Sequence, residues 1–367
     1  MTESAATPPR RDTLAPRLLF VPVSGPFGVG EYARSLAIAQ AAQRRWPEAC
    51  VHFILSRQAS YAASTPFPST LLESSPTFHS AAVVELIRSF RPGVVIFDNA
   101  GRTAQLRAAR EAGARVVYIS ARSRQRRKAF RLPWMRLIDE HWIAYPQLIA
   151  GPLNFWERIK LRMLGRPLIR YLDVILSRTS VSQADVILAR LGCNGGGYVL
   201  IVPGGGTGHP RASDATGTFF AAATALADRG VATVFVGPTP AAGAPAPTRS
   251  ALRCVASLPQ SELAELMRGA RLMVVNGGST LLQAIACGVA CIAIPIAHDQ
   301  DERIRRCVDA QVAMAATLDA ADILHVATGL LQNEPLRAVM AQRAAALKLA
   351  DGVEVAIGAL SRLVESG

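Results

Sequence analysis

Three glycine-rich turns contain the residue types that could bind a phosphate or a sugar. They read SGPFGVGE at 24–31, PGGGTGH at 203–209 and NGGST at 276–280. Each follows an apolar run and precedes a segment with helical periodicity, so backbone N–H groups near a helix N-terminus would face a ligand. The candidate binding residues in these turns are Gly28, Gly30, Gly204, Gly205, Gly206, Thr207, Asn276, Gly277, Gly278, Ser279 and Thr280. The second turn is not a P-loop, because no Gly-Lys-Ser/Thr sequence follows it.

Further polar candidates lie shortly after the third turn. Gln283 comes one helical turn after Ser279, within reach of a ribose if the turn holds phosphates. His298, Asp299 and Gln300 follow the next apolar run, and their polar groups suit sugar hydroxyls, which both donate and accept hydrogen bonds. Structural roles stay open here, since Ser279 could be a plain helix N-cap and a single His is often structural.

Apolar runs alternate with segments of helical periodicity along most of the chain. In the first half the predicted strands are 17–23, 50–56, 93–99, 114–120 and 140–145, and the predicted helices are 30–46, 83–90 and 103–113. In the second half the same alternation runs through strands 198–203, 231–237, 252–258, 271–277 and 291–297, with helices at 215–229 and 261–270. Repeated β–α–β order implies parallel sheets with helices on both faces. The predicted fold class is therefore α/β, with two Rossmann-like doubly wound domains facing each other across a cleft.

The domain boundaries expected from this order are as follows. Residues 1–16, polar and rich in Pro, should form a disordered leader. Residues 17–190 should form the first domain and residues 191–350 the second, with a helix in 351–367 that could cross back to the first domain. Ligands of doubly wound folds bind beyond the carboxyl ends of the strands, so the cleft is the expected site.

The most apolar stretch, residues 274–300, is predicted to be soluble structure rather than a membrane span. Gly277-Gly278, Gly288 and Pro295 punctuate it as a helix, a turn and a buried strand would require. The 367 residues are 50% hydrophobic and only 6% aromatic, which is typical of a globular α/β protein. The six cysteines form no CxxC pair, so we expect no metal site, no disulfide framework and a reducing, cytoplasmic location.

The net charge of +13 is concentrated in two segments, residues 122–136 and residues 156–170. Such a balance fits an anionic membrane face, a phosphorylated substrate, nucleic acid or simply a solvated surface rich in Arg. No aromatic stacking platform or recognition motif supports nucleic acid, so we expect none as a partner. The aromatic residues of the second segment favour peripheral contact of the whole region 122–170 with an anionic membrane.

Taken together, the turns resemble those of the GT-B glycosyltransferases. The segment LPQSELAELMRGARLMVVNGGSTLLQAIACGVACIAIPIAHDQ at 258–300 is similar to the donor-binding signature of the peptidoglycan UDP-GlcNAc transferases and of the UDP-sugar hydrolases of nonulosonate synthesis. The segment GVGEYARSLAIA at 28–39 resembles their GxGHxxRSLxLA turn. The resemblance implies that residues 204–207 and 277–280 hold phosphates, Gln283 the ribose, and Asp299 with Gln300 the sugar. It also implies no metal or other cofactor, because helix dipoles and backbone donors stabilise the departing diphosphate.

Two departures from the family pattern bear on catalysis. The family usually has Glu where this chain has Gln283, and His, a candidate base, where this chain has Glu31. A carboxylate can also act as a general base, so Glu31 is the first catalytic candidate, and Asp98 at the carboxyl end of a strand is the second. Glu31 could instead be present only because a helix start favours a carboxylate.

The leading functional hypothesis is an inverting, metal-independent glycosyltransferase. It would move a sugar from a nucleotide-sugar donor, with UDP the expected nucleotide, to an acceptor hydroxyl. A polyprenyl-linked or other glycan acceptor in cell-envelope synthesis, reached at the inner face of the membrane, is the associated expectation. The alternatives are a nucleotide-sugar hydrolase or epimerase on the same fold, and a non-catalytic binding subunit, which the two departures would suit.

Overall fold

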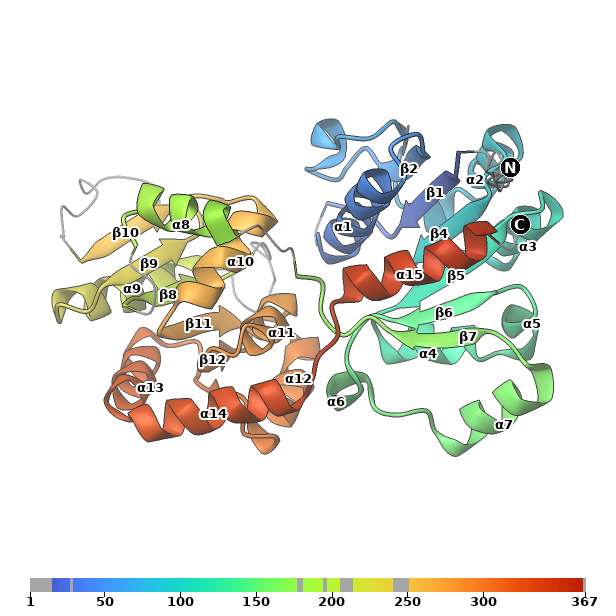
Figure 1. Ribbon diagram of the computed structural model, residues 1–367. Coiled ribbons are helices and arrows are strands. Elements are labelled where there is room, and N and C mark those ends of the chain that lie inside the picture. Colours follow the sequence, from blue (N-terminus) through green and yellow to red (C-terminus); the bar gives the residue numbers. More distant parts are fainter. Residues whose placement is uncertain are drawn as a thin grey trace, which may run out of the picture.

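The computed structural model describes residues 15–26, 29–176, 181–193, 197–204, 214–239 and 251–365, without the side chains of 181–183. In this part of the chain, two parallel β-sheets lie one after the other along the sequence (Figure 1). The predicted α/β class with two doubly wound units is confirmed. The predicted leader lies almost wholly outside the described residues, which begin at Ala15.

The first sheet has the strand order β3-β2-β1-β4-β5-β6-β7, and all its strand pairs are parallel. Its strands are β1 (Arg17–Pro22), β2 (Cys50–Ser56), β3 (Ser69–Leu72), β4 (Val94–Asp98), β5 (Arg115–Ser120), β6 (Glu140–Ile143) and β7 (Leu168–Tyr171). The direction of winding reverses between β1 and β4. Such a switch point opens a crevice beyond the carboxyl ends of the two strands.

Helices cover both faces of the first sheet. Alternate residues of β1 show this, since Leu18 belongs to a core with Ile38 and Leu360, whereas Leu19 belongs to a core with Val83. The first face is covered by α1 (Gly30–Arg45) and α15 (Gly352–Glu365), and the second by α2 (Ser80–Phe90), α3 (Thr103–Glu111), α4 (Ser123–Ala129) and α5 (Leu132–Met135). Between β6 and β7 the chain forms α6 (Gln147–Ala150) and α7 (Phe155–Leu164).

The second sheet repeats this plan with the order β10-β9-β8-β11-β12-β13. Its strands are β8 (Val199–Val202), β9 (Thr233–Val236), β10 (Leu252–Val255), β11 (Leu272–Asn276), β12 (Cys291–Ile294) and β13 (Met314–Ala315). One face packs on α8 (Val181–Arg190), α10 (Gln260–Gly269), α11 (Ser279–Ala286) and α12 (His298–Asp309), and the other on α9 (Ala215–Asp228) and α13 (Ala320–Gln332), with α14 (Glu334–Ala346) contributing to both cores. Here the switch point falls between β8 and β11.

The chain passes between the two halves twice, and the two crossings are bonded to each other. Val174 pairs with Asp351 in an isolated parallel bridge, and the N–H of Gly352 donates to the carbonyl of Val174 at 2.8 Å. After this point α15 runs back along α1 on the first sheet, as Figure 1 shows in red. The structure thus has a short double connection between its halves.

The contacts of α8 bear on the domain boundary expected at residue 190. Leu188 and Leu191 pack into the core of the second half, and α8 lies against α10. We therefore propose that the boundary falls before α8 rather than after it. The other boundaries stay predictions.

Most of the strands anticipated in the sequence are present within one or two residues of the expected limits. Three strands were not anticipated: β3, β7 and β13. They are edge strands of two to four residues. Short edge strands carry little of the apolar signal that marks a buried strand. Among the described helices none is long and apolar enough to cross a membrane.

Candidate functional site

The residues singled out in the sequence gather at the two switch points. The turn that leads to Glu31 follows β1, and Asn99 follows β4. In the second half, Gly204 follows β8 and Gly277 follows β11. Because all strands are parallel, their carboxyl ends share one edge, so each switch point brings two of these turns together.

Glu31 is held at the first switch point by Asn99. The side-chain amide of Asn99 donates to Glu31 Oε1 at 2.8 Å, while its carbonyl oxygen accepts the N–H of Ala121, beyond β5, at 2.8 Å. Asn99 adopts a left-handed backbone with φ of 52°, a region that Asn tolerates better than most residues. One carboxylate oxygen of Glu31 is thus fixed, and the half-buried side chain stays close to the crevice.

Asp98, the second catalytic candidate, is enclosed by its neighbours. Its side chain has no exposed surface, and both oxygens accept from Arg34, at 2.8 Å from Nε and 2.6 Å from Nη2. Burial raises the pKa of Asp98 to about 6, and Arg34 opposes this rise. A carboxylate that is buried and engaged on both oxygens is better suited to orient a helix than to remove a substrate proton. The geometry therefore favours Glu31 as the base.

Side-chain and main-chain groups are tightly packed at the second switch point. The amide of Asn276 donates to the carbonyl of Pro203 at 2.6 Å, and its oxygen accepts the N–H of Gly278 at 2.7 Å. Gly204 has φ of 85°, and a Cβ there would lie 1.9 Å from Asn276 Nδ2. Asn276 thus ties the two turns together and positions them. A side chain at Gly204 or at Gly278 would collide with Asn276.

Gly277 lies against α12. A Cβ at this position would lie 2.6 Å from Ile304 Cδ1 and 2.9 Å from Gln300 Cβ. The buried side chain of Arg303 donates to the carbonyl of Gly277, and Gln300 accepts the N–H of Ile296 at 3.0 Å. Gln300 therefore has a structural bond in addition to any role toward a sugar.

The start of α11 presents the polar groups expected to face phosphates. Ser279 is exposed in the first turn of the helix, and Thr280 is half-buried beside it. The alternative of Ser279 as a plain N-cap is wrong, because Gly278 holds the cap position and no side chain caps the helix. The hydroxyl and the first backbone N–H groups stay directed to the crevice end of the helix.

Gln283 makes a contact between the halves that the sequence did not suggest. Its side-chain amide donates to the carbonyl of Ile175, in the connection between the two halves, at 2.8 Å. A glutamate at this position could not make this bond, because a carboxylate has no proton to donate. The side-chain amide of Gln283 thus contacts the connection between the halves. The expected contact of Gln283 with a ribose stays a prediction.

His298 and Asp299 begin α12 at the same edge of the sheet. Both are exposed, and Asp299 lies 3.5 Å from Arg303. The four positions Gly28, Gly205, Gly206 and Thr207 lie outside the described residues. The structure therefore brings together Gly30 and Glu31 at one switch point, and Gly204, Asn276, Gly277, Gly278, Ser279 and Thr280 at the other, with Asp299 beside them.

Two of the cavities between the halves share Tyr145. The smaller, of about 50 Å³, is lined by Gly30 and Arg34 from the first half and by Ser279 and Gln283 from the second. The larger, of about 780 Å³, lies between α4 and α12. The two expected binding regions thus face each other across a space, as the cleft prediction required.

Two arginine side chains bridge the halves around these cavities in addition to Gln283. The guanidinium of Arg303 stacks over the ring of Tyr145 at 4.7 Å, and Arg306 donates to the carbonyl of Ile149 at 2.7 Å. Neither arginine was singled out in the sequence, where they belong to a charged helical segment with no special spacing. Arg34 was also missed, although it lies inside the turn that resembles the family motif.

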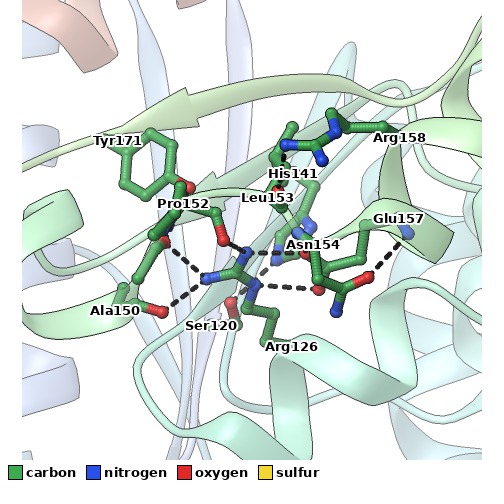
Figure 2. Close-up of polar contacts among 11 residues, drawn as sticks. Ser120, Arg126, His141, Ala150, Pro152, Leu153, Asn154, Glu157, Arg158 and Tyr171 are labelled. Atoms are coloured by element: carbon green, nitrogen blue, oxygen red, sulfur yellow. Dashed lines mark hydrogen bonds and ion pairs between the residues drawn. The ribbon is translucent and has the colours of Figure 1, made fainter.

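A second arginine network fixes the wall of the larger cavity (Figure 2). Arg126 donates to Glu157 from Nε at 3.0 Å and from Nη2 at 2.7 Å, and it also donates to the carbonyls of Ala150, Gly151 and Pro152. Glu157 in turn closes the capping box at the start of α7 with Asn154. These bonds hold the loop between β6 and α7 against α4.

His141 lies behind this wall as a neutral ring. It has no exposed surface, its Nε2 lies 2.8 Å from the hydroxyl of Ser120, and its Nδ1 has no hydrogen-bond partner among the described residues. Burial, with a contribution from Arg126, lowers the pKa of His141 to about 3. A ring that stays neutral across physiological pH is a poor proton acceptor, so we assign it no role in proton transfer. In the described part of the chain no group of three or more His, Cys, Asp or Glu side chains is placed to hold a metal ion.

Solved structures with this architecture are similar over nearly the whole chain, although no protein-family model and no curated protein matches it. The spinosyn forosaminyltransferase SpnP is 13% identical, with a TM-score of 0.66, covering 96% of this chain and 100% of that one. The Acinetobacter baumannii MurG is 14% identical, with a TM-score of 0.62, covering 95% and 99%. A Listeria monocytogenes protein assigned as a UDP-N-acetylglucosamine 2-epimerase is 14% identical, with a TM-score of 0.56, covering 94% of each chain. These likenesses show a shared fold.

The contact of Gln283 generates a prediction about the joint. The variant Gln283→Glu should lose the bond to Ile175 and leave two acceptors facing each other, at a local cost of about 1–3 kcal/mol. Faster hydrogen exchange of the backbone amides in residues 172–176 should follow. The matched control Gln332→Glu changes an exposed residue of α13 in the same way and should leave this exchange unchanged. Unaltered exchange in Gln283→Glu would show that the contact does not hold the joint.

Proposed function

We propose that this chain, which has the GT-B fold, is a glycosyltransferase that moves a sugar from a nucleotide-sugar donor to an acceptor hydroxyl. The observation that carries the proposal is the small cavity between the halves. Gly30, next to Glu31, lines it from one side, and Ser279, at the start of α11, lines it from the other. A base and a phosphate-binding helix start are the two elements that such a transfer needs, and the neighbourhood of Glu31 and the start of α11 at this cavity supports the proposal.

The donor is assigned to the second half. Its diphosphate would lie at the start of α11, where backbone N–H groups, Ser279 and Thr280 can donate. Asp299, exposed at the start of α12, would contact the sugar. We expect UDP as the nucleotide, on the resemblance of the donor segment.

In the proposed transfer, Glu31 acts as the general base. Glu31 takes the proton of the acceptor hydroxyl, whose oxygen forms a bond to the anomeric carbon. The bond from that carbon to the diphosphate oxygen breaks on the opposite side, so the anomeric configuration inverts. The departing diphosphate carries the electron pair, and the helix start stabilises its charge without a metal.

Contact with a membrane is the second part of the proposal. Helix α7 exposes Phe155, Trp156 and Met163, at 61%, 67% and 74%, and carries the exposed cations Arg158 and Arg162. Apolar side chains beside basic ones suit the surface of an anionic bilayer. The acceptor would then be lipid-linked, and the enzyme would be peripheral at the inner face of the membrane.

The donor assignment predicts metal-free binding of one nucleotide. In calorimetric titrations with UDP, GDP, dTDP and UDP-GlcNAc, we expect nucleotides with one of the nucleobases to bind clearly more tightly than the others. Slow release of free sugar during the titration would favour the hydrolase or epimerase alternative. Failure of all four to bind would overturn the donor assignment and favour a non-catalytic role.

The base assignment predicts a selective loss in Glu31→Gln. Turnover of the donor should fall by about 10²–10⁴-fold, the usual contribution of a general base, while the dissociation constant of the nucleotide stays within twofold. The control Asp98→Asn should instead destabilise the fold, by about 3–5 kcal/mol, because it leaves Arg34 without its buried partner. If Asp98→Asn folds normally and loses turnover while Glu31→Gln keeps it, the two roles must be exchanged.

The membrane assignment predicts that Phe155→Ser weakens retention on vesicles with anionic lipid at low salt. A loss of about tenfold in partition is expected from the apolar area withdrawn from the bilayer. Phe78→Ser is the matched control, since Phe78 is 73% exposed on the same half but outside α7, and its partition should not change. Absence of retention for the unaltered protein would remove the membrane from the proposal.

A further inference from the structure

The larger cavity between the halves has an excess of positive charge that the proposed function does not use. Its volume is about 780 Å³, and it lies beyond the carboxyl ends of β5 and β6, facing α12 across the cleft. Six arginines and three carboxylates line it: Arg122, Arg124, Arg126, Arg127, Arg303 and Arg306, with Glu157, Asp299 and Glu302. A cavity of this size accommodates a substrate-sized group.

The three carboxylates already have arginine partners. Glu157 is bound by Arg126 at 2.7 Å. Asp299 lies 3.5 Å from Arg303, and Glu302 lies 2.8 Å from Arg306. Each carboxylate that lines the cavity is thus paired with an arginine that also lines it. The positive charge that remains lies on the wall of the cavity opposite α12.

That opposite wall is formed by the start of α4 and the residue before it. Arg122, Arg124 and Arg127 are exposed there, and within the described residues none of the three forms an ion pair. The pKa of the neighbouring Lys128 shows the effect of these positive charges. Burial, followed by repulsion from nearby arginines including Arg124, lowers the pKa of Lys128 to about 8. Like charges have gathered here, and the part of the chain that the structure describes pairs none of Arg122, Arg124 and Arg127 with a carboxylate.

We infer that Arg124 and Arg127 bind a phosphate group carried by the acceptor. Three residues apart on one helix, their side chains lie on the same face and can take one phosphate between them. Guanidinium forks match phosphate oxygens in pairs, and two cations suit a doubly charged phosphate better than a single carboxylate. The inference rests on the proposed function, since it names the acceptor class of the same cleft.

The position of the pair favours the acceptor over the donor. Arg124 and Arg127 belong to the first half, which carries Glu31, whereas the expected donor loops belong to the second half. Tyr145 lines both cavities, so the larger one adjoins the space between Gly30 and Ser279. A molecule anchored by its phosphate at α4 would extend its hydroxyl toward that space.

Inorganic pyrophosphate, titrated by calorimetry into the full-length protein, tests the inference. The double variant R124S/R127S should bind it at least about tenfold more weakly than the unaltered protein, because two charge-assisted contacts are lost. The control R88S/R107S removes the same charge from two exposed arginines of α2 and α3 outside the cavity and should change binding by less than twofold. Nucleotide binding should be the same in all three proteins.

Three results would overturn the inference. These are no pyrophosphate binding at all, an equal loss in both double variants, and full displacement of pyrophosphate by the nucleotide that binds the donor site. The proposed function fails separately, when no nucleotide binds while pyrophosphate binding still depends on Arg124 and Arg127. Geranyl diphosphate then identifies the source of the phosphate: tighter binding than pyrophosphate indicates a lipid-borne acceptor, and equal binding a soluble one.

Discussion

The buried ion pair between Arg34 and Asp98 is the interaction on which the candidate catalytic region depends. It joins the first turns of α1 to the end of β4 through two hydrogen bonds of 2.8 and 2.6 Å. Both side chains are buried, so removal of either would leave an isolated charge in the core. The next residue, Asn99, holds Glu31 from the same strand end. The pair thus fixes the helix that carries Glu31, and Asn99 holds the carboxylate of Glu31 itself.

In the second half, hydrogen bonds to the main chain, and not a buried ion pair, hold the turns at the switch point in place. Asn276 bonds to the main chain on both sides, at Pro203 and Gly278, and the glycines beside it leave no volume for a side chain. A diphosphate bound there would meet N–H groups and hydroxyls instead of cations. Fixed dipoles of this kind can stabilise a negative charge without a permanent ion pair.

The two halves are joined by polar contacts and by apolar side chains of the first half, among them Leu148 and Ile149, that pack on the core of the second. Gln283 reaches Ile175, Arg306 reaches Ile149, and Arg303 stacks on Tyr145. The cavity with its arginines lies along this joint.

The sequence by itself determined the order of strands and helices, the two-domain α/β class and the turns that form the crevice, because apolar periodicity and glycine are local signals. It also named Glu31, through a turn motif. It did not determine the partners of the polar residues. Asp98, proposed as a base from its place at a strand end, proved to be enclosed by Arg34, 64 positions away, and Gln283 bonds to a carbonyl 108 positions away. Only the tertiary structure decides such pairings, because a hydrogen bond or an ion pair depends on distances in space that the spacing of residues along a chain does not record.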